Sequence, residues 1–353
     1  SGRPLRVKLG FDPSSPDLHL GHLVVLDKVR AFQDLGHQAV IIIGDYTARI
    51  GDPTGRSKTR APLDPEQVAA NAKTYTDQVF KIILREKTEI RRNGEWFDRF
   101  SYADVLKLNA EITVARLLER DDFRKRYADG APITLTEFQY PLMQGHDSVM
   151  VRSDVELGGS DQLFNNLVGR DLQRAAGQDP QAVMVLPILP GLDGVQKMSK
   201  SLGNYIGLTE DASEIFGKTM SISDELMAVW LRIMFQKEVD SSRHPMDVKK
   251  ELARALVTRL HDGSEATTAQ QAWERQFSER KAPEAMPEFQ LGKGKKLWEL
   301  LRDSGLAASG AEARRLVKQG AVSLDGGRLS DEDQLIQTPG TLKCGKRKFL
   351  RLI

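Results

Sequence analysis

The start of the chain alternates apolar and polar stretches in the order strand, loop, helix, strand. Residues 5–9 predict a short strand, and residues 23–35 carry apolar side chains at helical spacing before Gly36, a residue typical of helix ends. Residues 39–43 form a continuous apolar run, which predicts a buried parallel strand. These elements predict a βαβ unit, and the N-terminus of its helix is a favourable place for an anionic phosphate.

The same alternation continues over residues 1–217. Residues 183–186 predict a further buried strand that ends at Pro187. Between this strand and the βαβ unit, residues 66–171 predict a long helical stretch, which exceeds a single crossover between neighbouring strands. We therefore expect an α/β domain with a doubly wound parallel sheet and a helical insertion between its two halves.

Beyond this domain the pattern becomes helical and then mixed. The predicted helices cover residues 224–236, 247–261 and 269–280. Residues 283–294 combine Pro, Gly and Lys with little periodicity, which is typical of a linker. We therefore expect three domains: an α/β domain over 1–217, an α-helical domain over 218–285, and a small α+β module over 291–353.

The last module shows cap and turn signals. Its predicted elements are a helix over 295–302, a helix from Ser309 to Gly320, and strands over 321–324 and 348–352. Asp325-Gly326 is a strong signal for a tight hairpin turn. Two helices followed by a hairpin resemble the S4-type RNA-binding fold, in which the second helix would present Arg314, Arg315 and Lys318 to RNA. A dimerisation cap is the alternative interpretation.

Composition excludes membrane-spanning and disulfide-stabilised classes. The 353 residues are 40% hydrophobic and 28% charged, and no apolar run approaches the ~18 residues of a membrane span. The sequence has no signal-peptide pattern. The single cysteine, Cys344, excludes an internal disulfide and fits a reducing compartment. We therefore expect a cytoplasmic protein without a membrane partner.

Charge is unevenly distributed along the chain. Residues 291–353 contain 13 Lys and Arg against 7 Asp and Glu, whereas the rest of the chain contains 38 against 42. A basic tail on a slightly acidic body indicates a nucleic-acid partner, although solvated basic faces are common.

His19 and His22 lie in the first βα turn, and three interpretations of this pair compete. They could be partly buried histidines with local hydrogen bonds, or two ligands of a zinc ion. The zinc interpretation is weak because the chain has one cysteine and no H-E-x-x-H motif. The third interpretation is a pair of hydrogen-bond donors to charge that develops on a phosphate.

A second motif, Lys197-Met198-Ser199-Lys200-Ser201, follows His22 by about 175 residues. Two lysines in such a loop can bring positive charge to a triphosphate, although an isolated K-x-x-K is usually a solvated surface. The motifs G-x-x-x-x-G-K-[ST] and G-x-G-x-x-G are absent from the sequence. Together, H-x-G-H and K-M-S-K-S resemble the two signatures of class I aminoacyl-tRNA synthetases.

Within class I, nearly the whole chain resembles bacterial tyrosyl-tRNA synthetases. The matching stretches are residues 51–56, residues 140–147 and residues 158–162. Tyr140, Gln144 and Asp147 are spaced to lie along one helix face, and such a polar stripe suits a pocket wall. The resemblance implies a Rossmann-like catalytic domain that uses ATP as a substrate, with Mg²⁺ accompanying ATP and no dedicated protein cage for the metal.

The resemblance also implies a role for each matching residue. Asp147 would accept a hydrogen bond from the substrate phenol. The α-ammonium group would be held by Asp52, Tyr140 and Gln144, with Thr47 in the same pocket. Asp161 and Gln162 would contact the ribose and the substrate carboxylate.

ATP would further contact Asp12, Ser14, Gly21, Gly159, Met198 and Ser199. His19 and His22 would stabilise the transition state at the α-phosphate. Lys197 and Lys200 would hold the pyrophosphate, with Arg56 and Arg60 as looser candidates. Asp52 and Asp161 could alternatively be simple loop caps.

Lys8 departs from the pattern, because many relatives place a tyrosine four residues before the Asp-Pro of this loop. A lysine there could donate to the substrate phenol while Asp147 accepts, or it could pair with Asp147 and perturb it.

These observations predict a tyrosine–tRNA ligase that forms tyrosyl-adenylate and charges tRNA(Tyr). By resemblance, we expect a homodimer formed through an interface within residues ~98–150. The alternatives are a tryptophanyl-tRNA synthetase, a non-catalytic RNA-binding protein built on a synthetase body, and a small-molecule adenylyltransferase.

Overall fold

The computed structural model describes residues 2–13, 17–52, 65–275, 286–292, 294–345 and 348–353. It divides into two compact units, Ser1–Asp262 and Gly263–Ile353, which are treated separately below. The domain boundaries expected near residues 217 and 285 stay a prediction.

The first unit is built on a five-stranded sheet in the order β3-β2-β1-β4-β5, in which all neighbouring strands are parallel. The strands are β1 (Arg6–Phe11), β2 (Gln38–Ile43), β3 (Thr88–Arg92), β4 (Val155–Gly159) and β5 (Ala182–Leu186). The chain runs outward from β1 to β3, then returns to place β4 on the other side of β1. This reversal makes the sheet doubly wound, as the sequence predicted.

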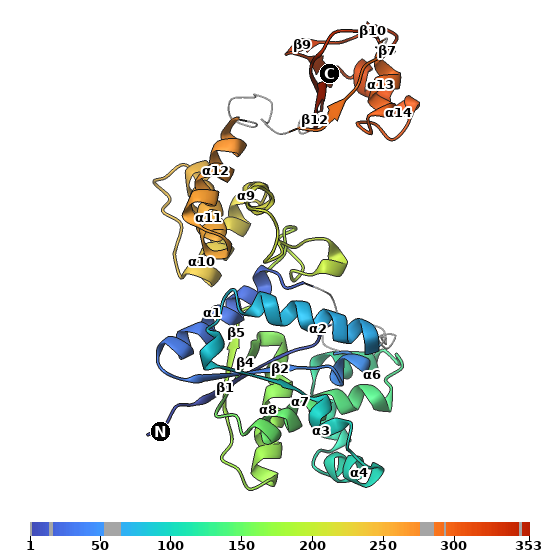
Figure 1. The fold of residues 1–353 in the computed structure, drawn as a ribbon. Coiled ribbons are helices and arrows are strands. Elements are labelled where there is room, and N and C mark those ends of the chain that lie inside the picture. Colours follow the sequence, from blue (N-terminus) through green and yellow to red (C-terminus); the bar gives the residue numbers. More distant parts are fainter. Residues whose placement is uncertain (1, 14–16, 53–64, 276–285, 293, 346–347) are drawn as a thin grey trace. The chain divides into compact units, whose positions relative to one another are not determined.

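Helices cover both faces of this sheet. Figure 1 shows α1 (Leu20–Asp34) and α2 (Pro65–Val79) on one face, and α7 (Leu135–Val151) and α8 (Leu163–Ala175) on the other. Right-handed crossovers require this arrangement when the winding direction reverses. Four short helices precede α7: α3 (Gly94–Phe97), α4 (Tyr102–Ala110), α5 (Val114–Leu117) and α6 (Asp121–Ala128). Single 3₁₀ turns occur at Thr47–Arg49, Arg85–Lys87, Ser160–Gln162 and Lys200–Leu202.

The structure corrects three sequence predictions in this unit. Strands β3 and β4 lie inside the stretch 66–171 that was predicted to be helical. β3 escaped recognition because its Thr-Glu-Ile-Arg-Arg sequence is charged and only partly buried. β5 was predicted to be buried, but it is an edge strand whose Met184 is exposed. Helix α1 starts at Leu20 rather than residue 23, so His22 belongs to its first turn.

Three helices follow the sheet in the first unit: α9 (Ala212–Met220), α10 (Asp224–Phe235) and α11 (Pro245–Leu260). α10 and α11 agree with the predicted helices to within two residues. Ser223 caps α10, and Pro245 stands at the start of α11, where its missing N–H is harmless.

The second unit begins with α12 (Gly263–Trp273), which starts six residues before the helix predicted over 269–280. Its main sheet has the order β6-β12-β11-β8-β9, with a second small sheet of β10 and β7. The strands are β6 (Glu288–Phe289), β7 (Lys295–Lys296), β8 (Val322–Leu324), β9 (Gly327–Arg328), β10 (Leu335–Ile336), β11 (Gly340–Cys344) and β12 (Lys348–Leu352). β6 falls within the predicted linker 283–294, and it pairs with β12. The linker prediction is therefore wrong for residues 288–289.

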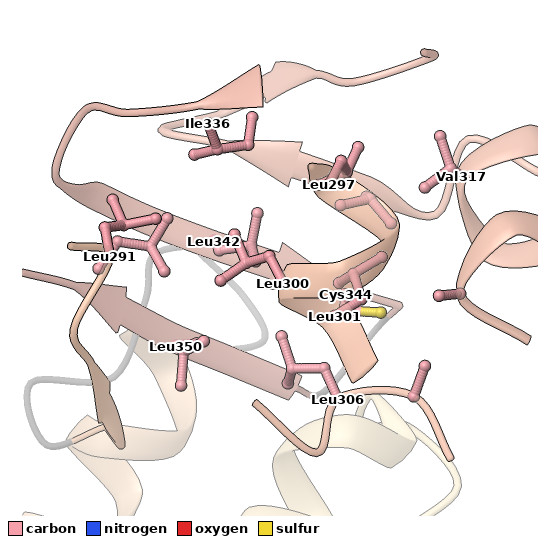
Figure 2. Packing of buried hydrophobic residues seen from close by; sticks show 14 residues of the cluster. Leu291, Leu297, Leu300, Leu301, Leu306, Val317, Ile336, Leu342, Cys344 and Leu350 are labelled. Carbon is pink, nitrogen blue, oxygen red and sulfur yellow. The ribbon is translucent and has the colours of Figure 1, made fainter. Parts of the chain in front are cut away.

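Helices α13 (Leu297–Asp303) and α14 (Gly310–Lys318) complete the second unit. Ser309 caps α14, as predicted. Asp325 and Gly326 both have positive φ, 49° and 84°, which is the geometry of a tight hairpin turn between β8 and β9. Leucines of α13 pack with β-strand residues in one apolar core that also buries Cys344 (Figure 2). The tail therefore has its own hydrophobic core.

Candidate functional site

A cavity of about 370 Å³ opens at the carboxyl ends of β1, β2 and β4. It lies where the winding direction of the sheet reverses, between β1 and β4, which is the usual ligand position in such sheets. Its lining includes the N-terminus of α1, one face of α7, and the loop that contains Lys197. The fold therefore brings segments from most of the first unit around a single cavity.

His19 and His22 form a reciprocal cap at the start of α1. The Nδ1 atom of His19 accepts from Gly21 N at 3.2 Å, and Nδ1 of His22 accepts from His19 N at 3.2 Å. Their ring centroids are 4.0 Å apart, and both residues line the cavity. Because Nδ1 is an acceptor in each neutral ring, the proton resides on Nε2, which remains a donor.

Both imidazoles are neutral near pH 7. Burial lowers the pKa of His19 to about 2, and the charges of His22, Lys200 and Lys197 act in the same direction. Burial likewise lowers the pKa of His22 to about 4. The pair therefore offers neutral N–H donors at a helix N-terminus rather than two cations.

Backbone pairing joins the two sequence motifs. Leu20 N donates to Ile206 O, and Leu208 N donates to Leu18 O, each at 3.0 Å. This short ladder attaches the segment after the lysine loop directly to the first βα turn. Asn204 shapes the loop itself, because its Oδ1 accepts from Ser199 N at 2.8 Å. Motifs separated by about 175 residues in sequence are thus adjacent in space.

The two lysines of the loop occupy different positions. Lys197 lines the cavity, and its ammonium lies 3.3 Å from Asp161 Oδ2. Lys200 is not among the residues that line the cavity, and its ammonium pairs with Asp17. Its charge nevertheless acts on both histidines. Lys200 therefore stands at the edge of the site.

Tyr140, Gln144 and Asp147 all face the cavity from α7. The hydroxyl of Tyr140 donates to Asp12 Oδ2 at 2.8 Å, and Thr47 donates to Asp12 Oδ1 at 2.8 Å. Burial, reinforced by the charge of Asp12, raises the pKa of Tyr140 well above its usual value, so Tyr140 is a neutral donor. The polar stripe seen in the sequence is a cavity wall.

Asp147 is buried at the inner end of this stripe. Its carboxylate accepts from Trp96 Nε1 at 3.0 Å and from Asn93 Nδ2 at 3.4 Å. Burial raises its pKa to about 7, the nearby Lys8 charge opposes that rise, and the Glu156 charge adds to it. A carboxylate in this position can accept a hydrogen bond from a group that enters the cavity.

Asp52 reaches the cavity from the loop after β2. Gln162 Nε2 donates to its Oδ2 at 2.8 Å, and Arg120 Nη2 donates to its Oδ1 at 3.1 Å. Asn165 donates to the side-chain oxygens of both Gln144 and Gln162. These contacts tie Asp52, Gln144 and Gln162 into one hydrogen-bonded group at the cavity wall.

Lys8 makes neither of the direct contacts that the sequence-based alternatives predicted, although its charge does lower the pKa of Asp147. It is fully buried, and its ammonium lies 2.9 Å from Glu156 Oε1 rather than pairing with Asp147. Its remaining contacts are the Ser148 hydroxyl and the Gln144 carbonyl oxygen. With three donors bonded to three acceptors, Lys8 has no N–H left for a substrate phenol. The prediction of direct contact is therefore wrong.

Comparison with known proteins identifies the family. Residues 1–278 match the family model of class I tRNA synthetases for tryptophan and tyrosine, and residues 279–349 match the C-terminal domain of tyrosine–tRNA ligases. A tyrosine–tRNA ligase of Desulfotalea psychrophila is 51% identical over 100% of this chain and 91% of its own length. The chain belongs to the tyrosine–tRNA ligase family.

A second relative supports the same family assignment, and a solved structure shares the fold. The tyrosine–tRNA ligase of Oleidesulfovibrio alaskensis is 52% identical over 100% of the chain and 92% of its own length. The crystal structure of an Archaeoglobus fulgidus tyrosyl-tRNA synthetase with L-tyrosine has a TM-score of 0.60 at 22% identity, covering 75% of this chain and 91% of that one. The latter likeness concerns the fold alone. The alternative of a tryptophan enzyme is not favoured.

The other predicted residues of this family member can now be placed. Those that line the cavity are Gly21, Thr47, Gly159, Asp161, Gln162, Met198 and Ser199. Ser14, Arg56 and Arg60 lie outside the described residues. Residues that the sequence reasoning missed are Asn93, Trp96, Arg120 and Asn204. Asn93 and Trp96 follow β3, the strand that was not recognised, and no local pattern distinguishes Arg120 from an ordinary surface arginine.

The predicted RNA-binding residues lie on α14 in the second unit. Arg314 stacks over the Trp298 ring at 4.6 Å, and Arg302 of α13 lies 5.1 Å from the same ring. Lys318 is exposed and its ammonium is 3.3 Å from Glu332. Arg315 is also exposed. This surface combines positive charge with an aromatic ring.

Among the described residues, no group of three or more His, Cys, Asp or Glu side chains could hold a metal ion. None of the described helices is both long and apolar enough to cross a membrane.

Proposed function

We propose that this chain activates L-tyrosine with ATP to form tyrosyl-adenylate and then transfers the tyrosyl group to the 3′ end of tRNA(Tyr). One observation carries the proposal. The ladder between Leu18–Leu20 and Ile206–Leu208 holds the histidine turn beside the lysine loop, at a cavity whose inner wall presents Asp147. A phosphate end and a phenol end are therefore parts of one cavity.

At the phosphate end, the tyrosine carboxylate attacks the α-phosphorus of ATP in line, and pyrophosphate leaves. His19 and His22 are neutral near pH 7, so they stabilise the transition state as hydrogen-bond donors. The ammonium groups of Lys197 and Lys200 stabilise the negative charge that develops on the leaving pyrophosphate. Lys197 must exchange Asp161 for phosphate, and Lys200 must exchange Asp17.

Gly44 lacks a side chain where the Asp12 carboxylate and the Thr47 hydroxyl approach its backbone. A β-carbon on Gly44 would lie 2.1 Å from Asp12 Oδ1 and 2.3 Å from Thr47 Oγ1. Glycine therefore permits the contact between Asp12 and Thr47. We assign Asp12, together with Gly21, Gly159, Met198 and Ser199, to ATP binding.

At the amino-acid end, Asp147 accepts the phenol hydrogen bond. Asp52, Tyr140 and Gln144 hold the α-ammonium group, and Thr47 supports them through Asp12. Asp161 and Gln162 contact the ribose and carboxylate region. Phenylalanine is rejected because it would leave the buried Asp147 without the partner that the phenol supplies.

The second step needs no nucleophilic side chain. The terminal ribose hydroxyl of tRNA attacks the mixed anhydride carbonyl, and AMP leaves with the electron pair. Catalysis is then largely the positioning of reactants and the stabilisation of developing charge. We assign α14, with Arg314, Arg315 and Lys318, to tRNA binding.

The remaining parts of the proposal rest on the family resemblance. Mg²⁺ is proposed to arrive with ATP. A homodimer through residues ~98–150 and a cytoplasmic location are also proposed, and sedimentation tests the dimer. The proposed domains are residues 1–217 for catalysis, 218–285 for the anticodon arm, and 291–353 for RNA binding.

A pyrophosphate exchange assay across the twenty amino acids tests the function. We expect exchange of labelled pyrophosphate into ATP with tyrosine, and little with tryptophan or phenylalanine. Exchange driven by tryptophan alone contradicts the proposal. Charging of tRNA(Tyr) by the same preparation tests the second step, and its failure despite tyrosine-dependent exchange contradicts only that step.

A further inference from the structure

A fully buried ion pair lies directly behind the tyrosine-binding face of α7. Lys8 of β1 and Glu156 of β4 are opposite each other in the parallel pairing of these strands. Their side chains are 1% and 2% exposed, and Lys8 Nζ lies 2.9 Å from Glu156 Oε1. Neither residue lines the cavity. Burying two charges is costly, and such a pair is weak evidence for a contribution to stability.

The ammonium of Lys8 contacts α7 at two points. It donates to the Ser148 hydroxyl at 2.7 Å and to the Gln144 carbonyl oxygen at 2.8 Å. Gln144 and Ser148 are four residues apart, so these contacts span one helical turn. Asp147 belongs to that turn, and both Gln144 and Asp147 face the cavity.

Glu156 completes the attachment. It accepts from the Ser148 hydroxyl at 3.1 Å and also from the Gln181 side chain. Gln181 belongs to the segment that leads into β5, and its backbone N–H donates to Gln173 of α8 at 2.7 Å. The pair thereby fixes one turn of α7 against the sheet through hydrogen bonds that apolar side chains cannot make.

From these contacts we propose that Lys8 is a positioning residue that determines specificity for tyrosine. The Lys8–Glu156 pair holds the turn of α7 so that the Asp147 carboxylate meets the phenol of the substrate. This inference rests on the proposed function. Lys8 thus acts on the phenol through Asp147, without touching the substrate.

The proposal predicts different effects on tyrosine and phenylalanine, which differ only by the phenol hydroxyl. A shift of the α7 turn weakens the hydrogen bond between the tyrosine phenol and Asp147, whereas phenylalanine has no such bond to lose. Loss of the pair should therefore raise KM for tyrosine more than KM for phenylalanine. A general loss of structure would instead change both amino acids, and ATP, together.

The main variant is Lys8→Met combined with Glu156→Gln, which removes both charges without leaving one buried alone. In pyrophosphate exchange, we expect KM for tyrosine to rise about tenfold, while kcat and KM for ATP change less than about threefold. The preference for tyrosine over phenylalanine, measured as the ratio of kcat/KM values, should fall by a similar factor.

Lys249→Met is the matched control. Lys249 is also a buried lysine that donates to a backbone carbonyl, Ile222 O at 2.7 Å, and to a carboxylate, Asp224 Oδ1 at 2.8 Å. It lies in α11, away from the cavity lining. We expect the control to keep the wild-type preference for tyrosine.

Ser148→Ala is a second variant for the case in which the double variant does not fold. It removes one contact between Lys8 and α7 but keeps the ion pair, so the preference for tyrosine should fall about threefold.

The outcomes are distinct. No tyrosine-dependent exchange by the wild type contradicts the proposed function itself. Normal wild-type exchange, with an unchanged preference in the double variant or in a folded Ser148→Ala, overturns the role of Lys8. Equal losses for tyrosine, phenylalanine and ATP also overturn it, because they indicate structural damage.

Discussion

Arg120 Nη2 lies 3.1 Å from Asp52 Oδ1, although the two residues are 68 positions apart in the sequence. Arg120 is almost fully buried, and it also donates to Asn165 at 3.2 Å and to Asp122 at 2.8 Å. The guanidinium therefore joins Asp52, the carboxylate that we assign to the α-ammonium group, to Asp122 of α6 and Asn165 of α8. Asp52 is held in one orientation by a residue that itself does not line the cavity.

Arg120→Met should raise KM for tyrosine about tenfold in pyrophosphate exchange and lower kcat less than about threefold, because Asp52 loses a charge-assisted hydrogen bond. Arg126→Met is a matched control, since Arg126 is a buried arginine of α6, the helix that Arg120 precedes, and it pairs with Glu137. The control should lose stability while its KM for tyrosine stays near that of the wild type. An equal rise of KM in both variants would mean that the effect is not specific to Asp52.

Lys200→Ala should slow adenylate formation by about a hundredfold with little change in tyrosine affinity, because the charge on the leaving pyrophosphate exists mainly in the transition state. Single-turnover kinetics measures the rate, and equilibrium dialysis measures the affinity. Lys218→Ala is the matched control, because Lys218 and Lys200 lie 5.4 Å and 5.6 Å from the same Tyr205 ring. An unchanged rate in Lys200→Ala would remove it from the transition-state assignment.

The preference for tyrosine should depend on pH near neutrality. Burial raises the pKa of Asp147 to about 7, against the opposing charge of Lys8 and with the added charge of Glu156. Above this pH the group is an ionised acceptor for the phenol, and below it the group is protonated. The kcat/KM for tyrosine should therefore rise with pH through about 7 and then level off. The value for phenylalanine should not rise, because phenylalanine leaves the ionised carboxylate without a partner.

Asp147→Asn is the control for this pH dependence, because an amide does not ionise. Its kcat/KM for tyrosine should be low and should not rise between about pH 6 and about pH 8, the interval that brackets the pKa of about 7 of Asp147 in the wild type. Parallel profiles for tyrosine and phenylalanine in the wild type would show that another group controls the pH dependence.

The basic surface of α14 should matter for tRNA alone. Replacing Arg314, Arg315 and Lys318 together with alanine should raise KM for tRNA about tenfold and reduce the salt dependence of charging, because fewer phosphates are neutralised. Pyrophosphate exchange should not change. The control removes Arg328, Lys343 and Arg351 from the strands of the same unit. If both triple variants weaken charging equally, net charge rather than the α14 surface is responsible.

The sequence predicted helix caps and tight turns correctly where their geometry depends on residues adjacent in the sequence. The Ser309 cap and the Asp325-Gly326 turn were predicted correctly, because capping and positive φ depend on a few adjacent groups. The paired motifs likewise gave the family. β3 was missed because a charged, half-buried strand has no clear periodicity, and the edge position of β5 depends on which strands come to lie beside it.

The sequence by itself determined the first βαβ unit, the polar stripe of α7 and the chemistry available at the two motifs, since residue type and spacing carry that information. Only the tertiary structure decided what each buried charge contacts. Lys8 pairs with Glu156, 148 residues away, and Arg120 pairs with Asp52. Such partners are chosen by the pairing of strands and the docking of helices, because a charge withdrawn from water must find its opposite among whatever groups the fold places beside it.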